Sequence, residues 1–262
     1  MYLPVPSQPD CVSAWLEAVR LVNARPGHHD HNVVIDVANP LARASRSDPV
    51  VAEVDAFFEN RDTKRIETVA NTIFPAALYR RYGSPAFFDR FRDKVLPKVR
   101  SQGKKSWSGY YFERMMQLPQ PEGEPINQLT EIIGRLKDPN VRALNKFELS
   151  VFDPARDVDG SPYGGQCLSF ASFKLIGDGN DRRLALTAMY RNHYYIEKLL
   201  GNLIGLGRLL QFVGEESGIA TGSLTVLSTH ATVDVKNGKW NRGDIDTLLA
   251  NCDQANSLAL AA

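Results

Sequence analysis

Apolar residues recur with helical spacing in several stretches of the chain. In residues 11–24 they fall on one face, and Pro26-Gly27 ends the pattern, which predicts an amphipathic first helix. In residues 126–137 the same spacing ends at Asp138-Pro139. Further helices are predicted at residues 49–60, at residues 63–100 as a pair separated at Gly83-Ser84-Pro85, and from residue 194 to about 213.

Strands are predicted where β-branched residues cluster or where apolar and polar residues alternate. The clearest signal is a hairpin, because residues 168–176 and 183–191 are both strand-like and a Gly-Asp-Gly-Asn-Asp segment separates them. Residues 31–38, 146–152 and 224–235 predict three more strands. The small apolar tail, residues 256–262, is expected to fray or to dock weakly.

Composition narrows the class of protein. The 262 residues are 43% hydrophobic, enough for one sizeable core, and we expect one domain over residues 1–262. The formal net charge of +1 gives no overall field for nucleic acid or for an anionic membrane. No apolar run approaches the roughly 18 residues of a membrane span, and residues 1–10 lack a basic segment leading into an apolar one. We therefore expect a soluble protein with no nucleic-acid or membrane partner.

The cysteines favour a reducing compartment. Cys11, Cys167 and Cys252 are odd in number and widely spaced, without a C-x-x-C pair, which argues against a disulfide framework or a zinc site. A cytoplasmic location fits this pattern. His28, His29 and His31 form a tight group that could bind a metal, but no cysteine accompanies them, and we predict no metal site.

Cys167 stands where a Gly-Gly turn becomes the first hairpin strand, so its side chain can face a cleft. A lone cysteine is more often a small buried apolar residue. What favours chemistry is the order of the polar residues around it. After Gly-Gly-Gln-Cys come a hairpin ending in Tyr190-Arg191-Asn192, a helix containing Gly201-Asn202, and a β-run bearing Thr229-His230.

This order resembles the thymidylate synthase family, whose nucleophilic cysteine is followed by a hairpin ending in Tyr-Gln-Arg-Ser, a helix with an asparagine and a strand with Thr-His. Arg191 and Asn202 lie 11 positions apart, the family's spacing between its phosphate-binding arginine and its base-reading asparagine. Upstream, residues 109–114 resemble the Tyr-Gly-Glu-Arg segment of archaeal-type members. Residues 138–142 resemble Asp-Pro-x-Ser-Arg-Arg, whose arginines reach the phosphate in the partner subunit.

The resemblance implies an α/β fold of the α+β type, a mixed β-sheet flanked by helices that forms a homodimer through the sheet. It implies a transferase that adds a methyl or hydroxymethyl group to C5 of a pyrimidine nucleoside monophosphate, preferably dUMP, with 5,10-methylenetetrahydrofolate as cofactor. The implied roles are Cys167 as nucleophile, Tyr111 in proton transfer, Asn202 on the base, Arg191 and Arg142 on the phosphate, His230 on the sugar, and Asn192 on the substrate in place of the family's serine.

The chemistry of these side chains is coherent. A thiolate can add to C6 of uracil and make C5 a carbon nucleophile. A guanidinium such as that of Arg191 would lower the thiol pKa and also hold a phosphate. The amide of Asn202 offers one donor and one acceptor, which match O4 and N3–H of uracil, whereas an aspartate would suit cytosine better.

Departures from the family pattern leave alternatives open. Ala143 replaces the second arginine, Thr232 replaces the tyrosine after the strand histidine, and the best register puts Asn71 where the catalytic glutamate belongs, with Glu67 nearby. A nucleotide-binding protein on the same scaffold, without the chemistry, is the second hypothesis. A weaker one is a cysteine hydrolase that uses Cys167 with His230. Arg43 and Arg46 form either a phosphate-binding flap or a solvated loop.

Overall fold

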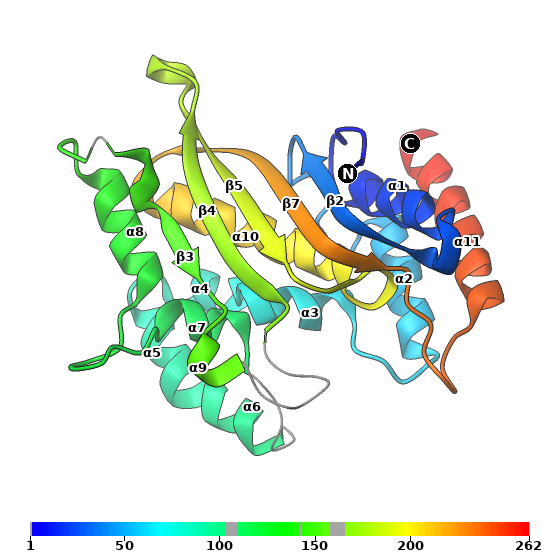
Figure 1. Ribbon diagram of the computed structural model, residues 1–262, viewed down its shortest axis with the longest axis horizontal. Helices are drawn as coiled ribbons and strands as arrows, with labels where there is room; N and C mark the ends of the chain where they lie inside the picture. The colour runs from blue at the N-terminus through cyan, green and yellow to red at the C-terminus, as the bar shows by residue number, and fades with distance from the viewer. Residues whose placement is uncertain (1, 103–108, 142, 158–165, 262) are drawn as a thin grey trace.

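The computed structural model describes residues 2–102, 109–141, 143–157 and 166–261 (Figure 1). A mixed seven-stranded sheet runs through it, in the order β1-β2-β7-β5-β4-β3, and β6 pairs with β7. Parallel pairs are β1/β2, β5/β7 and β6/β7, and the other pairs are antiparallel. The expected mixed sheet flanked by helices is confirmed. The strands are β1 (Leu3–Pro4), β2 (His29–Val37), β3 (Glu148–Ser150), β4 (Leu168–Ile176), β5 (Arg183–Tyr190), β6 (His193–Tyr194) and β7 (Ala220–Thr232).

Helices pack behind the sheet in Figure 1, and α10 crosses directly behind β5 and β7. The α-helices are α1 (Cys11–Asn23), α2 (Pro49–Glu59), α3 (Ile66–Ile73), α4 (Ala76–Tyr82), α5 (Ala86–Arg90), α6 (Leu96–Gln102), α7 (Tyr111–Met116), α8 (Gln128–Lys137), α9 (Pro154–Asp157), α10 (Leu200–Ser217) and α11 (Arg242–Ala261). Short 3-10 or π turns are η1 (Pro26–His28), η2 (Phe91–Val95), η3 (Leu144–Lys146), η4 (Gly179–Asp181) and η5 (Tyr195–Leu199). None of the helices in the described ranges combines the length and the apolar character that a bilayer span requires.

Two glycines let α3 lie close against α10. A Cβ atom on Gly201 would come within 2.6 Å of Val69 Cβ, and one on Gly205 within 2.8 Å of the Ala70 carbonyl oxygen. Residues without a side chain at these positions allow the two backbones to approach. The approach also holds Asn202, next to Gly201, beside α3.

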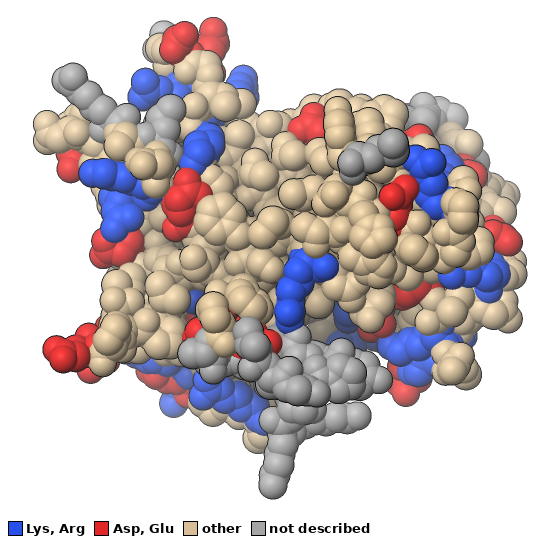
Figure 2. Space-filling view, viewed as in Figure 1, with Lys and Arg blue, Asp and Glu red and all other residues tan. Residues whose placement is uncertain are grey.

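The two faces of the sheet differ in character. One face presents side chains such as Leu186, Ala188 and Val226 to the helices, and these are fully or almost fully buried. The opposite face, toward the viewer in Figure 1, is largely uncharged across its centre in the space-filling view (Figure 2). Half-exposed apolar side chains lie there in register across four strands, in the order Val34, Leu227, Met189 and Phe170.

The main elements agree with the sequence prediction, and the differences have local causes. The first helix predicted in residues 63–100 breaks at Phe74 and Pro75, where proline lacks the N–H that would continue the ladder. The strand predicted at 146–152 is shorter, and the one predicted at 224–235 begins at Ala220 and ends at Thr232. The tail, expected to fray or to dock weakly, continues α11 as far as Ala261 and so is not frayed.

Candidate active site

A cavity of about 220 Å³ opens where β4 begins, between α3, α7 and the start of α10. Cys167, Tyr111 and Asn202 all line it, although they are far apart in sequence. The remaining lining residues are Lys64, Thr68, Val69, Thr72, Gly109, Tyr110, Gln166 and Lys198. The fold therefore brings the three residues that sequence analysis assigned to catalysis around one space.

Cys167 lies immediately before β4, and Arg191 holds this segment from the end of β5. The Arg191 backbone N–H donates to the Cys167 carbonyl oxygen at 2.9 Å, and the Arg191 Nε–H donates to the Gln166 carbonyl oxygen at 3.0 Å. The guanidinium carbon also lies 5.1 Å from the centroid of the Phe152 ring. Arg191 is thus placed beside the cysteine, although it does not line the cavity.

The acidity of Cys167 differs from our expectation. Burial raises the pKa of the thiol, and the positive charges of Arg191 and Lys198 lower it by less, so the pKa is raised overall. Arg191 does act in the expected direction, but desolvation outweighs it. At neutral pH the group is therefore a thiol, and forming the nucleophile requires the loss of a proton.

Asn202 is held by a residue that the sequence analysis missed. His193 Nε2 accepts a hydrogen bond from Asn202 Nδ2 at 2.9 Å, and His193 Nδ1 lies 2.9 Å from Ser228 Oγ. Burial lowers the pKa of His193 to about 3, so the ring is neutral, and the tautomer that satisfies both contacts carries its proton on Nδ1. One amide N–H of Asn202 is used in this way, which leaves the carbonyl oxygen and the second N–H for a ligand.

Tyr111 begins α7 and lies near a second buried tyrosine. Burial and then the nearby Cys167 raise the pKa of Tyr111, so the side chain stays a phenol that can donate and accept a hydrogen bond. Its ring meets that of Tyr190 edge-on at 6.4 Å, and the Tyr190 ring stacks on His193 at 4.0 Å. The Tyr190 hydroxyl is buried without a hydrogen-bond partner among the described residues.

His230 and Asn192 form a separate group beside this cavity and do not line it. His230 Nδ1 lies 2.8 Å from Asn192 Oδ1, and the His230 ring lies 5.6 Å from that of His29 and 5.3 Å from that of His31. Burial, followed by the charges of the neighbouring His31 and His29, lowers the pKa of His230. His230 is therefore neutral at pH 7 and can donate or accept a hydrogen bond.

Across the described part of the chain, no group of three His, Cys, Asp or Glu residues could hold a metal ion.

The sequence analysis also considered charged residues for phosphate binding or catalysis, and the structure places them as follows. Arg142 lies outside the described residues. Glu67 lines a different cavity, where the two Nη atoms of Arg208 form a bidentate ion pair with its two carboxylate oxygens at 3.0 and 2.8 Å. The described lining of the Cys167 cavity contains no carboxylate. Arg43 pairs with Asp48 at 2.8 Å, and Arg46 borders the same cavity as Glu67.

Comparison with known proteins gives partial matches to curated proteins that share one name. No family model matches the chain. Over 108 residues the chain is 30% identical to a protein of Methanothermobacter thermautotrophicus named "Putative thymidylate synthase", and over 110 residues it is 31% identical to one of the same name from Methanococcoides burtonii. Each match covers 41% of this chain and 45 or 46% of the relative, so the chain spans about half the length of these relatives. The chain is distantly similar to thymidylate-synthase-like proteins.

Proposed function

We propose that the chain is a transferase that adds a one-carbon unit, methyl or hydroxymethyl, to C5 of a pyrimidine nucleoside monophosphate, with dUMP preferred. The observation that carries the proposal is the shared cavity of Cys167, Tyr111 and Asn202. It supplies a nucleophile, a proton-transfer group and a base-reading amide within a space of about 220 Å³. The distant similarity to thymidylate-synthase-like proteins supports the same reaction class.

The proposed chemistry begins with the loss of the Cys167 proton. The sulfur then bonds to C6 of the pyrimidine, and the electron pair of the C5–C6 double bond moves to C5, which attacks the one-carbon electrophile. Loss of the C5 proton and departure of the one-carbon unit's carrier leave an exocyclic methylene at C5. Addition of water to this methylene gives the hydroxymethyl product and addition of hydride from a hydride donor gives the methyl product, and expulsion of the thiolate restores the ring. Tyr111, which remains a phenol, is suited to exchange the C5 proton through water.

Substrate binding is assigned to the groups around the cavity. The free carbonyl and N–H of Asn202, oriented by His193, match N3–H and O4 of uracil. In this proposal Arg191 binds the phosphate together with Arg142, while His230 and Asn192 contact the sugar. Neutral His230, paired with Asn192, is suited to a hydroxyl because it offers a hydrogen bond without adding charge.

The one-carbon donor enters the proposal from the resemblance alone. It is 5,10-methylenetetrahydrofolate in the family. The residues that line the cavity of about 220 Å³ are assigned to the nucleotide, and none of the described residues is assigned to the folate.

A second candidate is a nucleotide-binding protein that keeps the scaffold and lacks the chemistry. The described lining of the Cys167 cavity contains no carboxylate, and Glu67 is tied to Arg208. Asn71, which stands where the family has its catalytic glutamate, contributes a hydrogen bond that lowers the pKa of Glu67. These features favour binding without turnover.

Titration calorimetry with dUMP, UMP, dCMP and CMP tests the proposed substrate. We expect dUMP to bind most tightly to the wild type. Asn202→Asp should weaken the binding of dUMP at least tenfold and favour the binding of dCMP, because a carboxylate cannot donate a hydrogen bond to O4. The exposed substitution Asp246→Asn on α11 serves as control. Equal dUMP affinity in wild type and Asn202→Asp, or no binding of any of the four, would contradict the assignment. Binding without release of tritium from C5 would favour the second candidate.

A further inference from the structure

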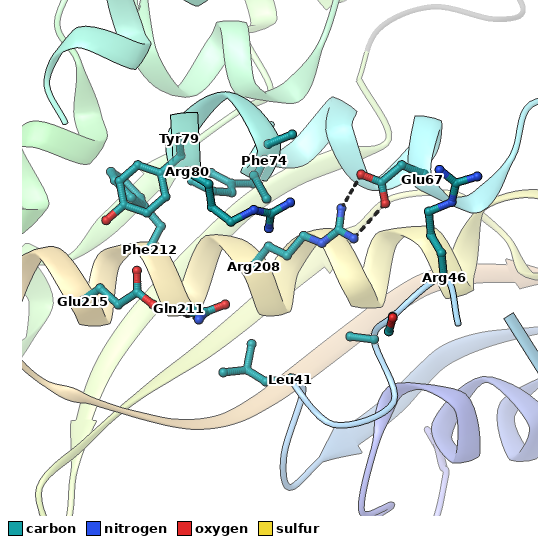
Figure 3. Close-up of a pocket in the computed structure, with 14 residues that line it drawn as sticks. Leu41, Arg46, Glu67, Phe74, Tyr79, Arg80, Arg208, Gln211, Phe212 and Glu215 are labelled. Carbon is teal, nitrogen blue, oxygen red and sulfur yellow. Dashed lines mark hydrogen bonds and ion pairs between the residues drawn. The ribbon is translucent and has the colours of Figure 1, made fainter. Parts of the chain in front are cut away.

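A second and larger cavity, of about 730 Å³, is lined by residues that do not line the Cys167 cavity (Figure 3). Thr68 and Thr72 of α3 border the Cys167 cavity, whereas Glu67 borders the larger one. The other walls of the larger cavity come from the loop after β2, from α4 and from α10. The volume falls within the range of small-molecule sites, roughly 300–1,000 Å³. None of the functions proposed above uses it.

Three arginines from three different elements converge on this cavity. Arg46 comes from the loop after β2, Arg80 from α4 and Arg208 from α10. Arg208 forms a bidentate ion pair with Glu67. Figure 3 shows the guanidinium groups of Arg80 and Arg46 on opposite sides of this pair. Although burial raises the pKa of Glu67, Arg208 and more weakly Arg46 hold it below its usual value. The carboxylate of Glu67 is therefore ionised and already paired.

The positive charge around this pair exceeds the negative charge. Within the described ranges, no ion pair or hydrogen bond joins Arg46 or Arg80 to a carboxylate. Both residues are exposed, and both line the cavity. The other lining acid, Glu215, lies at the far end, where Gln211 donates to it at 2.8 Å. Three arginines against two glutamates in the lining leave an excess of positive charge, which attracts anions.

We propose that this cavity binds a small polyanion that carries at least two phosphate or carboxylate groups. Guanidinium groups match both oxyanions with paired hydrogen bonds. One group of the ligand meets Arg80 and Arg208, and another meets Arg46 on the far side of Glu67. Leu41 and Tyr79 provide an apolar wall for the part between them. The site is separate from the nucleotide site, since the two cavities share no lining residue and use different residues of α3.

Calorimetric titration of the full chain with pyrophosphate and with citrate tests this site and separates the two kinds of ligand. We expect saturable 1:1 binding of at least one probe, weakened at least tenfold in Arg80→Gln and in Arg46→Gln and weakened by added salt. Arg81→Gln is the matched control, because Arg81 follows Arg80 on α4 but does not line the cavity. Cys167→Ser should bind the probe as wild type does.

Several outcomes would overturn the proposal. These are no saturable binding of either probe, wild-type affinity in both Arg80→Gln and Arg46→Gln, or an equal loss in Arg81→Gln. Competition between the probe and dUMP would assign the binding to the Cys167 cavity instead. Failure of dUMP to bind at all would count against the transferase and leave the polyanion site unaffected.

Discussion

At the scale of single residues, the environment of Cys167 decides how the proposed reaction begins. A thiol whose pKa is raised by burial is a weak nucleophile until a base or a ligand removes its proton. Arg191 and Lys198 oppose this effect without cancelling it. The site is thus built to keep the sulfur protonated in the absence of substrate.

Alkylation of Cys167 by iodoacetamide should report this directly. We expect the rate to keep rising with pH beyond the ordinary thiol value of about 8.5, because only the thiolate reacts. Lys198→Gln should shift the curve to still higher pH. Cys11 and Cys252 are fully buried, so Cys167→Ser should abolish the fast labelling. A rate that is already level below pH 8 would show that the thiol pKa is not raised.

His193 should make the fold sensitive to acid. Its pKa is about 3 in the folded chain and about 6.5 when unfolded, so between these values only the unfolded chain takes up the proton, and stability falls as pH falls. His193→Gln keeps both hydrogen-bonding roles without titrating. In urea unfolding, the stability advantage of wild type over this variant should shrink by about 1.4 kcal/mol per pH unit from pH 6 to 4. Parallel curves for the two proteins would contradict the buried neutral histidine.

At the scale of elements, a carboxylate from another part of the chain caps the N-terminus of the helical segment that carries Asn202. Asp234, just after β7, accepts hydrogen bonds from the backbone N–H groups of Ile196 at 2.8 Å and Glu197 at 3.4 Å. No side chain at the preceding Tyr194 caps this start. The loop after β7 therefore fixes where η5 and α10 begin, and with them the position of Asn202.

Replacement of Asp234 by alanine should loosen this helix start. We expect Asp234→Ala to lower the free energy of unfolding by about 1–2 kcal/mol, because two helix N–H groups lose their acceptor. Asp246→Ala, on the exposed side of α11, should change it by less than about 0.5 kcal/mol. Thermal or urea unfolding measures both, and equal stabilities of the two variants would argue against the cap.

Elements with a strong local pattern could be predicted from sequence, and those set by distant contacts could not. The hairpin of β4 and β5 follows from alternation and a glycine-rich turn. Helix α11 was missed although Ile245, Leu248 and Cys252 recur with helical spacing and are buried, because the small residues after them hid the pattern. His193 could not be assigned either, since its contacts to Asn202 and Ser228 depend on how β6, α10 and β7 meet.

At the scale of the whole molecule, the largely uncharged sheet face in Figure 2 suits the homodimer that the resemblance implies, and we propose this face as its interface. The row of Val34, Leu227, Met189 and Phe170 leaves apolar area partly exposed across four strands. Exposed apolar surface of this kind is typical of an interface. Covering it with a second copy of the same face would remove it from water.

Sedimentation should show a dimer, at twice the chain mass of 29.2 kDa. We expect Met189→Lys to convert it into a monomer, because two copies of the face would then bring buried lysines together. Thr130→Lys, on the exposed surface of α8, should leave the dimer intact. A monomeric wild type, or a dimeric Met189→Lys, would exclude this face as the interface.

Exchange of tritium from C5 of labelled dUMP tests the central claim most directly, because release requires covalent addition at C6. The account predicts release by wild type and a loss of at least a thousandfold in Cys167→Ser, with dUMP binding retained. Release at the wild-type rate by Cys167→Ser, or no release by wild type while dUMP binds, would contradict it.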